Sequence, residues 1–378
     1  MLGSYLNGLL MRRLRFVSAA MATCLVLGCG KRGGGSPDTQ ASVHLVILGQ
    51  ALIEHDPREY LEAPLSSIMP ILRAADGVFT NLEVAVSGPG CPCVRTRDDV
   101  FFHGAEPDVL DFLRELGVSL LALSNNHSWD YGTEGILSTI AETEIQGLIH
   151  AGTGADLTAA TAPAYLDLGD LRLGLVSMAT VNLSEEARAT DSRAGINMLD
   201  PGDSTDWDRN ITSVRTAASA SDVVIVYQHF QTDAEIGWQE SWAQATINAG
   251  ADIYVSHGEP TLKGVEVYNG GLILYGLGNF IFHTKTELGR YPPDVWESVI
   301  VEVSIAAEGW DEVTFTPVVL NSEGVEGPSF FETRGYPEVA VGVLGQDILR
   351  RLIDLSSPYG TMIELGDGKA TLRIGDQG

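Results

Sequence analysis

Four apolar segments of this chain each run directly into a group of polar residues. The segments are short and continuous, which is typical of buried strands. The polar groups that follow them are Asn81 with Glu83, Asn125 to His127, Gln228 with His229, and Ser256 with His257. Because the carboxyl ends of neighbouring strands meet at one edge of a sheet, we expect these groups to form a single site. Histidine, carboxylate and amide side chains together suit a divalent cation such as Mn, Zn or Fe.

Each of these residues also has a structural interpretation when it is taken alone. Asn125 and Asn126 are common turn residues. A histidine such as His229 can be buried with its hydrogen bonds satisfied, and Glu83 can serve as a salt-bridge partner. The hypothesis of a site therefore depends on all four groups standing at strand ends.

The order of the expected elements predicts an α/β fold. Strands alternate with helices early in the chain and hairpins follow later, which favours a layered sandwich over a purely parallel, doubly wound sheet. Apolar patterns place strands at 43–48, 77–82, 118–123, 222–227, 253–255, 299–305 and 313–319, with hairpins over 166–178 and 265–277. Helical patterns span 107–117, 132–145, 209–220, 238–249 and 343–355. The polar stretch from about 184 to 210 predicts an irregular surface segment.

The charge balance excludes nucleic acid as a default partner. The chain has 23 Lys and Arg residues against 50 Asp and Glu residues, a formal net charge of −27. A backbone of phosphates needs a basic face, and anionic lipid needs one too. Beyond the first 30 residues no apolar run approaches the ~20 residues of a membrane span, so the pattern also argues against a channel.

The first 29 residues have the pattern of a secretory signal. Arg12, Arg13 and Arg15 precede an apolar stretch over 16–27. The following Val-Leu-Gly-Cys resembles a bacterial lipobox, in which Cys29 would be acylated after cleavage. Residues 30–42 would then be a flexible tether, and the membrane would be reached only through this lipid. An ordinary cleaved signal and a single membrane anchor are the alternatives.

Two further cysteines, Cys91 and Cys93, stand in a loop rich in Gly and Pro. An oxidising compartment favours pairing them, although a spacing of one residue makes a strained ring. A redox pair, a soft-metal site, a local loop staple and two free thiols all remain open.

Three blocks of sequence together resemble one known family. They are Asn-Leu-Glu at 81–83, LSNNHSWDYG at 123–132 and GVEVYNGGLILYGLGNFIF at 264–282. They are similar to the CapA family of capsule or poly-γ-glutamate synthesis proteins, over residues 43–285. The resemblance implies a metallophosphatase-like (calcineurin-like) fold: a four-layer αββα sandwich of two mixed sheets, with a metal site between the sheets. It also implies a location in the bacterial cell envelope. We expect this domain to span 43–320, with 321–378 as an extension packing on it.

The resemblance implies roles for particular residues. Those matching its ligand positions are Glu83, Asn126, His229 and His257. His127, oriented by Asp130, would act as the general acid. The substrate would be an envelope polymer or a phosphoester.

The chain departs from the family pattern at several ligand positions. The first strand usually ends in Gly-Asp, but here Gln50 follows Gly49. The last motif, usually Gly-His-His-Pro-His, keeps only His257, with Gly258 and Pro260 in place of ligands. Further candidates to supply a ligand atom are Gln50, His55, Asn81, Asn125 and Glu259. We therefore expect one bound ion rather than two, or none.

Three functions remain open from the sequence. The first is a metal-dependent hydrolase or transferase on an envelope polymer or phosphoester. The second is a non-catalytic binding or scaffold protein on the same fold, which the missing ligands favour. The third is a structural or redox module centred on Cys91 and Cys93. A strongly acidic chain repels a polyanion such as poly-γ-glutamate unless a metal or a basic patch intervenes, and Arg95 with Arg97 is one such local exception.

Overall fold

The computed structural model describes residues 42–378, except for 62–64, 233–235, 307–308, 326, 328 and 378. The expected signal, the lipobox Cys29 and most of the expected tether lie outside the described residues. Among the described residues, no helix has both the length and the apolar character needed to cross a membrane.

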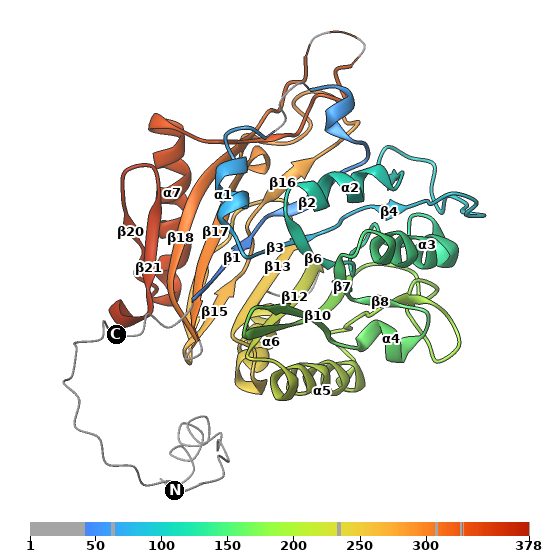
Figure 1. Cartoon of the computed structure of the whole chain (residues 1–378), viewed down its shortest axis with the longest axis horizontal. Helices are drawn as coiled ribbons and strands as arrows, with labels where there is room; N and C mark the ends of the chain where they lie inside the picture. Colours follow the sequence, from blue (N-terminus) through green and yellow to red (C-terminus); the bar gives the residue numbers. More distant parts are fainter. Residues whose placement is uncertain are drawn as a thin grey trace, which may run out of the picture. The chain divides into compact units, whose positions relative to one another are not determined.

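The first sheet has nine strands and is mixed (Figure 1). Its strands are β20 (Glu364–Leu365), β21 (Ala370–Arg373), β18 (Gly309–Leu320), β17 (Glu297–Ala306), β1 (Val43–Ile47), β3 (Gly77–Asn81), β6 (Val118–Ala122) and β7 (Ile149–Ala151), in that order, with β19 (Pro337–Val339) also on β18. The run from β1 to β7 is parallel, and the pairings on the β17 side are antiparallel. The parallel half delivers its carboxyl ends to one edge.

The second sheet has six strands and is also mixed. Its order is β14 (Val265–Tyr268), β15 (Gly271–Leu274), β13 (Ile253–Gly258), β12 (Val223–Gln231), β10 (Leu171–Val181) and β9 (Ala164–Leu168). The four central strands are parallel, and β9 and β14 close the two sides as antiparallel hairpins.

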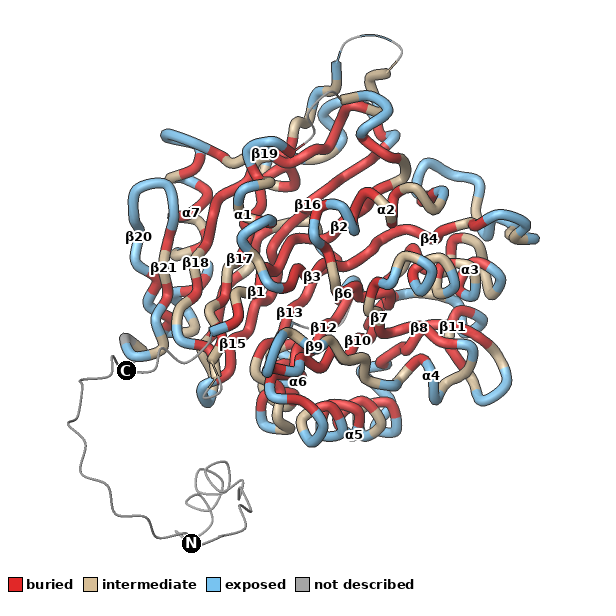
Figure 2. The backbone as a smooth tube through the Cα atoms, viewed as in Figure 1, coloured by how far each residue is buried: buried red, intermediate tan, exposed pale blue. Residues whose placement is uncertain are grey.

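Side-chain alternation along the strands builds the layers. On β1, Leu45 and Ile47 face a cluster that also contains Ile225 and Val255 of the second sheet, so this cluster fills the space between the sheets. The intervening Val46 packs with α1 (Met69–Ala74) and α2 (Asp108–Glu115) on the opposite face. In Figure 2 the strands of both sheets are coloured as buried along most of their length.

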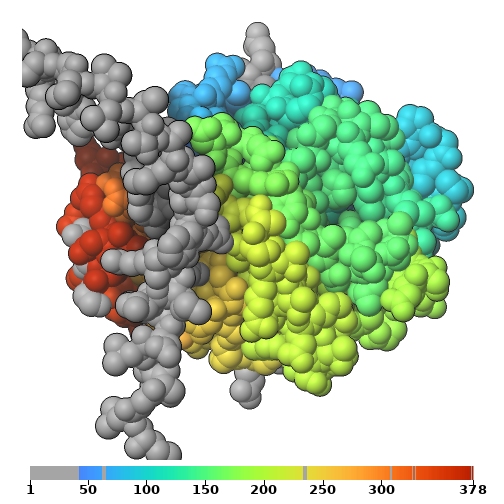
Figure 3. Space-filling model, turned by 60° about the horizontal axis from the view of Figure 1, so that its bottom comes forward, coloured from blue at the N-terminus to red at the C-terminus, as the bar shows by residue number. Residues whose placement is uncertain are grey.

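Helices cover the outer face of the second sheet in the same way. Val224 and Val226 of β12 pack against α5 (Ser204–Ala220) and α6 (Ile236–Ala249). In Figure 3 the green and yellow parts of the chain, which include α5 and α6, form much of the visible face. The architecture is thus helix, sheet, sheet, helix, which confirms the predicted α/β sandwich of two mixed sheets.

The remaining helices and short strands lie around the two sheets. The helices are α3 (Gly132–Ile145), α4 (Leu157–Thr161) and α7 (Gly342–Ser356), with short 3-10 turns at Pro57–Glu59, Pro293–Trp296, Ser357–Tyr359 and Ile374–Asp376. The short strands pair as β2 (Gln50–Leu52) with β16 (Asn279–Phe282), β4 (Ala85–Val86) with β5 (Gly104–Ala105), and β8 (Thr153–Gly154) with β11 (Gly195–Ile196). Helix α7 contacts β18 of the first sheet and β14 of the second.

The predicted irregular segment is wrong over its last residues. Helix α5 begins at Ser204, because the Asp203 side chain accepts a hydrogen bond from the backbone N–H of Thr205 (2.8 Å) and caps the first turn. The prediction for α3 matches the structure, whereas α1 and β16 were not expected.

Candidate metal centre

The polar groups that follow the four strands meet where the two sheets face each other. Glu83 follows β3, and Asn126 lies in the turn after β6, both on the first sheet. His229 and His257 lie at the ends of β12 and β13 and are paired neighbours in the second sheet. Parallel pairing within each sheet therefore brings these side chains to one edge, as the sequence predicts.

Glu83 and His229 lie close to each other in a buried environment. Oε1 of Glu83 is 3.7 Å from Nε2 of His229, and the two residues are 3 % and 0 % exposed. Burial, together with the negative charge of Asp130, raises the pKa of Glu83 well above its usual value. Burial and the nearby His127 and His257 lower the pKa of His229 well below its usual value. Both shifts favour the uncharged forms of Glu83 and His229, so the two side chains lie close together without forming a full ion pair.

The site contains buried polar atoms that have no hydrogen-bond partner. They are Oε2 of Glu83, Oδ1 of Asn126, Nε2 of His229 and both ring nitrogens of His257. Buried polar atoms are nearly always partnered, so this concentration needs an explanation. Burial lowers the pKa of His257 to about 3, which keeps its imidazole in the neutral form that ligates metals.

The donor set fits one borderline cation by its chemistry. Two imidazoles, one carboxylate and one amide oxygen are suitable ligands for Mn, Zn or Fe. As the side chains lie, however, the described residues contain no group of three or more His, Cys, Asp and Glu that could hold an ion. Glu83, His229 and His257 would therefore have to move closer together to hold an ion, with the amide of Asn126 as a fourth ligand.

A carboxylate–histidine pair stands beside this set. His127 donates from Nδ1 to Oδ2 of Asp130 (2.9 Å), and its backbone N–H donates to Oδ1 of Asn125 (3.0 Å). The same Asp130 oxygen accepts the backbone N–H of His103 (2.7 Å). Burial lowers the pKa of His127, and the bond to Asp130 opposes that shift. Within the described residues Nε2 of His127 has no hydrogen-bond partner, so this atom is free to take part in proton transfer.

Asn81 and Asn125 fix the turn that carries His127. Asn125 donates from Nδ2 to Oδ1 of Asn81 (3.0 Å) and to the carbonyl of Leu82 (2.7 Å). Both asparagines are fully buried. The contacts of Asn125 are the structural ones expected of a turn residue, and Asn81 is the last residue of β3.

Gln50 and Gly258, which the resemblance aligns with ligand positions, make structural contacts in this chain. Gln50 donates from Nε2 to Oδ1 of Asn279 (2.9 Å), and its Oε1 accepts the backbone N–H of Gly258 (3.1 Å). A Cβ at Gly258 would lie 2.2 Å from the carbonyl oxygen of Phe230, and its φ is +128°. The backbone therefore has no room for a side chain at position 258.

Two further candidates lie apart from the cluster. Glu259 pairs with Lys263 (2.8 Å), and its side chain is 63 % exposed. The His55 ring stacks on that of His283, with centroids 4.0 Å apart, and its Nε2 lies 3.1 Å from the Tyr336 hydroxyl. In this structure neither side chain contacts the four proposed ligands.

Cys91 and Cys93 are joined by a disulfide. The segment that follows the disulfide reaches the turn of the carboxylate–histidine pair, because the Thr96 backbone N–H donates to the carbonyl of Asp130 (2.9 Å). The sequence left several states open for these cysteines. The disulfide excludes one of them, a pair of free thiols, in this structure.

Residues 44–284 match the family described as Bacterial capsule synthesis protein PGA_cap. The chain belongs to this family. The match covers the parallel half of the first sheet, the second sheet and all four strand-end groups, so the PGA_cap domain contains the whole candidate metal centre.

Named relatives of this PGA_cap protein include two capsule proteins. The chain is 25 % identical to the PGA biosynthesis protein CapA of Bacillus subtilis, over 87 % of this chain and 80 % of that protein. It is 26 % identical to the capsule biosynthesis protein CapA of Bacillus anthracis, over 89 % and 77 %. An uncharacterized protein y4uA of Sinorhizobium fredii is 27 % identical over 89 % and 93 %. A hypothetical protein from Thermus thermophilus has a structure with a TM-score of 0.43 and 17 % identity, covering 79 % of this chain and 98 % of that one.

Three residues near the PGA_cap site were missed by the sequence reasoning. Glu54 follows β2, His103 precedes β5, and Lys285 lies in the loop after β16. His103 contacts Glu54 from 49 positions away. Glu54 follows a strand of only three residues that the apolar patterns did not mark, and His103 and Lys285 lie in loops, so the strand-end pattern carries no signal for them.

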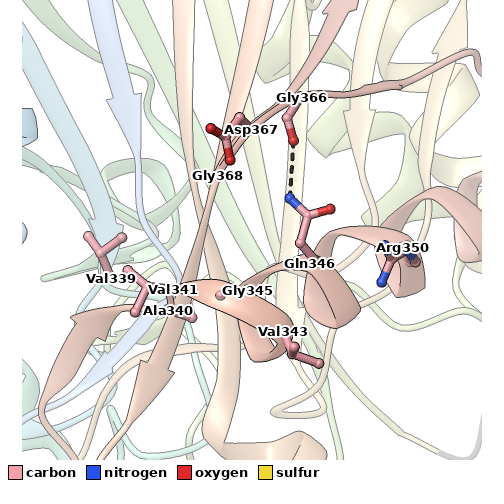
Figure 4. A pocket seen from close by; sticks show the side chains of 11 residues that line it. Val339, Ala340, Val341, Val343, Gly345, Gln346, Arg350, Gly366, Asp367 and Gly368 are labelled. Atoms are coloured by element: carbon pink, nitrogen blue, oxygen red, sulfur yellow. Dashed lines mark hydrogen bonds between the residues drawn. The ribbon is translucent and has the colours of Figure 1, made fainter.

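A separate hollow of about 760 Å³ lies between the start of α7 and the turn at 366–368 (Figure 4). Gln346 spans it by donating from Nε2 to the carbonyl of Gly366 (3.1 Å). The ionisable side chains in its lining are Arg350 and Asp367. No residue of the candidate metal centre lines this hollow.

Proposed function

We propose that this protein is a metal-dependent hydrolase or transferase in the synthesis of a surface polymer of the capsule or poly-γ-glutamate type. Membership of the capsule synthesis family and the names of the Bacillus relatives support the polymer. The unpartnered buried atoms of Glu83, Asn126 and His229 support the metal. That concentration of unpartnered ligand atoms is the observation that carries the proposal.

Glu83, Asn126, His229 and His257 would hold one Mn, Zn or Fe ion. When bound, such an ion polarises the scissile group and lowers the pKa of a water molecule. His127, held at Nδ1 by Asp130, would give a proton from Nε2 to the departing oxygen of the substrate when its ring is in the charged imidazolium form. Because Glu83, His127, His229 and His257 are almost fully buried, they would act away from bulk water.

Turnover by the chain from residue 30 onward tests this proposal. The protein is supplied in turn with Mn, Zn and Fe, and a phosphodiester and a γ-linked glutamate oligomer serve as probes. We expect one probe to be cleaved, and His127→Asn to lower kcat about 10²–10⁴-fold. His150→Asn, a histidine on β7 outside the site, is the matched control and should keep its activity. If neither probe is cleaved with any of the three metals, the proposal is contradicted.

A non-catalytic binding or scaffold protein on the same fold is the second candidate. It is favoured by the amide of Gln50, which is already bonded to Asn279 and Gly258, and by the lack of space at Gly258. This alternative predicts that the protein binds the glutamate oligomer equally well with His127→Asn and in the presence of a chelator.

We further propose that the protein is a lipoprotein of the bacterial cell envelope, held by a lipid on Cys29. The lipobox-like sequence supports this location. In a bacterial host, Cys29→Ser should move the protein from the membrane fraction to the soluble fraction and abolish its labelling by fatty acid. A labelled Cys29→Ser variant would contradict the anchor.

A further inference from the structure

We propose that His103, held by Glu54, is a second carboxylate–histidine pair that takes a proton from the nucleophile while His127 gives one to the leaving group. This inference rests on the proposed function, because it assigns a role to His103 in that reaction. The substrate in this step is a phosphoester attacked by water, one of the substrate classes that the proposed function includes.

Glu54 and His103 form a close, buried contact. Nδ1 of His103 donates to Oε1 of Glu54 at 2.6 Å, and the two side chains are 5 % and 7 % exposed. This is the arrangement of His127 and Asp130, whose side chains are 9 % and 3 % exposed. A carboxylate on Nδ1 fixes the tautomer of an imidazole and increases the basicity of its Nε2.

The two pairs are joined through Asp130 and through their rings. Oδ2 of Asp130 accepts both Nδ1 of His127 and the backbone N–H of His103. The rings of His103 and His127 meet edge to face, with centroids 4.4 Å apart and an interplanar angle of 80°. Both imidazoles therefore have fixed orientations within one small volume.

The Glu54 carboxylate is kept charged by its neighbours. Lys285 donates from Nζ to Oε2 of Glu54 (2.5 Å). Burial raises the pKa of Glu54, but the bonds to His103 and Lys285 lower it by more, and the net shift is downward. The Glu54 backbone N–H also donates to Nδ1 of His283 (3.0 Å), which fixes the strand end that carries it. The Glu54 carboxylate is therefore held in place beside Nδ1 of His103.

A protein base suits the reduced metal site. With Gln50 bonded elsewhere and no side chain possible at Gly258, this chain has fewer groups to activate a nucleophile. In the step we infer, water loses a proton to Nε2 of His103 as its oxygen bonds to phosphorus. The bond from phosphorus to the leaving oxygen breaks, and that oxygen takes the proton from Nε2 of His127. One bond forms, one breaks, and no electron acceptor is needed.

Reaction of the histidines with diethyl pyrocarbonate tests whether His103 is a reachable base. Peptide mass spectrometry gives the rate at each histidine of the same chain. His44, with a side chain 31 % exposed, is the reactive reference, and the buried His283 is the unreactive one. We expect His103 to react at least tenfold faster than His283, and Glu54→Gln to slow His103 several-fold without slowing His44. A His103 as unreactive as His283 would overturn the inference.

Turnover of the phosphodiester probe tests the role of His103 in the reaction. We expect His103→Asn to lower kcat about 10²-fold with unchanged metal content, and Glu54→Gln to lower it less. His150→Asn is the matched control, and thermal unfolding of each variant shows whether it folds. If His103→Asn and the wild type have equal kcat, the inference fails and the proposed function stands. If the wild type cleaves only the glutamate oligomer, the inference fails and the proposed function stands. If it cleaves neither probe, the proposed function fails and the proton role of His103 fails with it.

Discussion

Partial burial opposes the protonation of His150 on β7. It lowers the pKa of this imidazole below the usual 6.5 by more than the carboxylate of Glu144 raises it. At higher pH the folded and unfolded chains both hold His150 neutral. As the pH falls through 6.5, the unfolded chain takes up a proton that the folded chain resists, so the free energy of unfolding decreases.

We therefore predict that His150→Gln reduces the loss of stability on acidification. Urea unfolding is measured between about pH 7.5 and pH 5.5, where histidines change charge. The free energy of unfolding should fall less in the variant than in the wild type, because the variant has no group to protonate at this position. Parallel curves for the two proteins would contradict this assignment.

The residues of the site were partly predictable, for a local reason. Glu83, Asn126, His229 and His257 each stand at the end of an apolar strand, and strand ends can be found from sequence. Glu54 and His103 come together across 49 positions through loops, and no local pattern marks such a contact. Glu259 was a candidate by its neighbours in sequence, but the structure pairs it with Lys263 on the surface.

At the scale of the elements, the end of β13 depends on Gly258. Its φ of +128° and the 2.2 Å approach of a built Cβ to the Phe230 carbonyl oxygen leave no relaxed conformation for another residue. We predict that Gly258→Ala lowers the free energy of unfolding by about 1–3 kcal/mol, as measured by urea unfolding. Gly237→Ala, in helix α6, is the control. A Cβ at this position meets no atom within 4 Å. Equal stability of the two variants would contradict the proposed strain.

The ranges of the helices are predicted better by the spacing of apolar residues than by the amino-acid composition of a segment. Helix α3 spans the predicted residues 132–145, because Gly132 and the apolar spacing mark its range. The polar composition before residue 210 hid the first turn of α5, since Asp203 is a cap rather than a loop residue. Strand β16 was missed because it pairs with β2, more than 220 positions away.

At the scale of the whole molecule, the C-terminal segment contributes to the core between the sheets. Ile348, Leu349 and Leu352 of α7 are fully buried there. Burying three such side chains stabilises a fold by about 5–9 kcal/mol, which is comparable with a total stability of ~5–15 kcal/mol. β19 and β21 in addition pair with β18.

We therefore predict that a chain ending at residue 320 does not fold cooperatively. Near-ultraviolet circular dichroism and thermal unfolding should show no native signal and no sharp transition. The full-length chain is the control, and Val343→Ser, at a position 77 % exposed on α7, tests whether surface changes in this helix are tolerated. A truncated chain that melts like the full-length one would show that residues 43–320 are an independent domain.

The sandwich and the family could be predicted from sequence, because long motifs and strand patterns carry both. The number of bound ions could not, since it depends on whether Asn126 and three ionisable side chains close around a cation. That closure is the central claim of the proposed function.

The most direct test is the metal content of the purified chain from residue 30 onward, measured by elemental analysis after supplying Mn, Zn and Fe. We predict about one ion per chain, lost in His229→Ala and in Glu83→Gln and retained in His150→Ala. No bound metal in the wild type, or equal metal in His229→Ala, would contradict the metal centre and favour the binding protein.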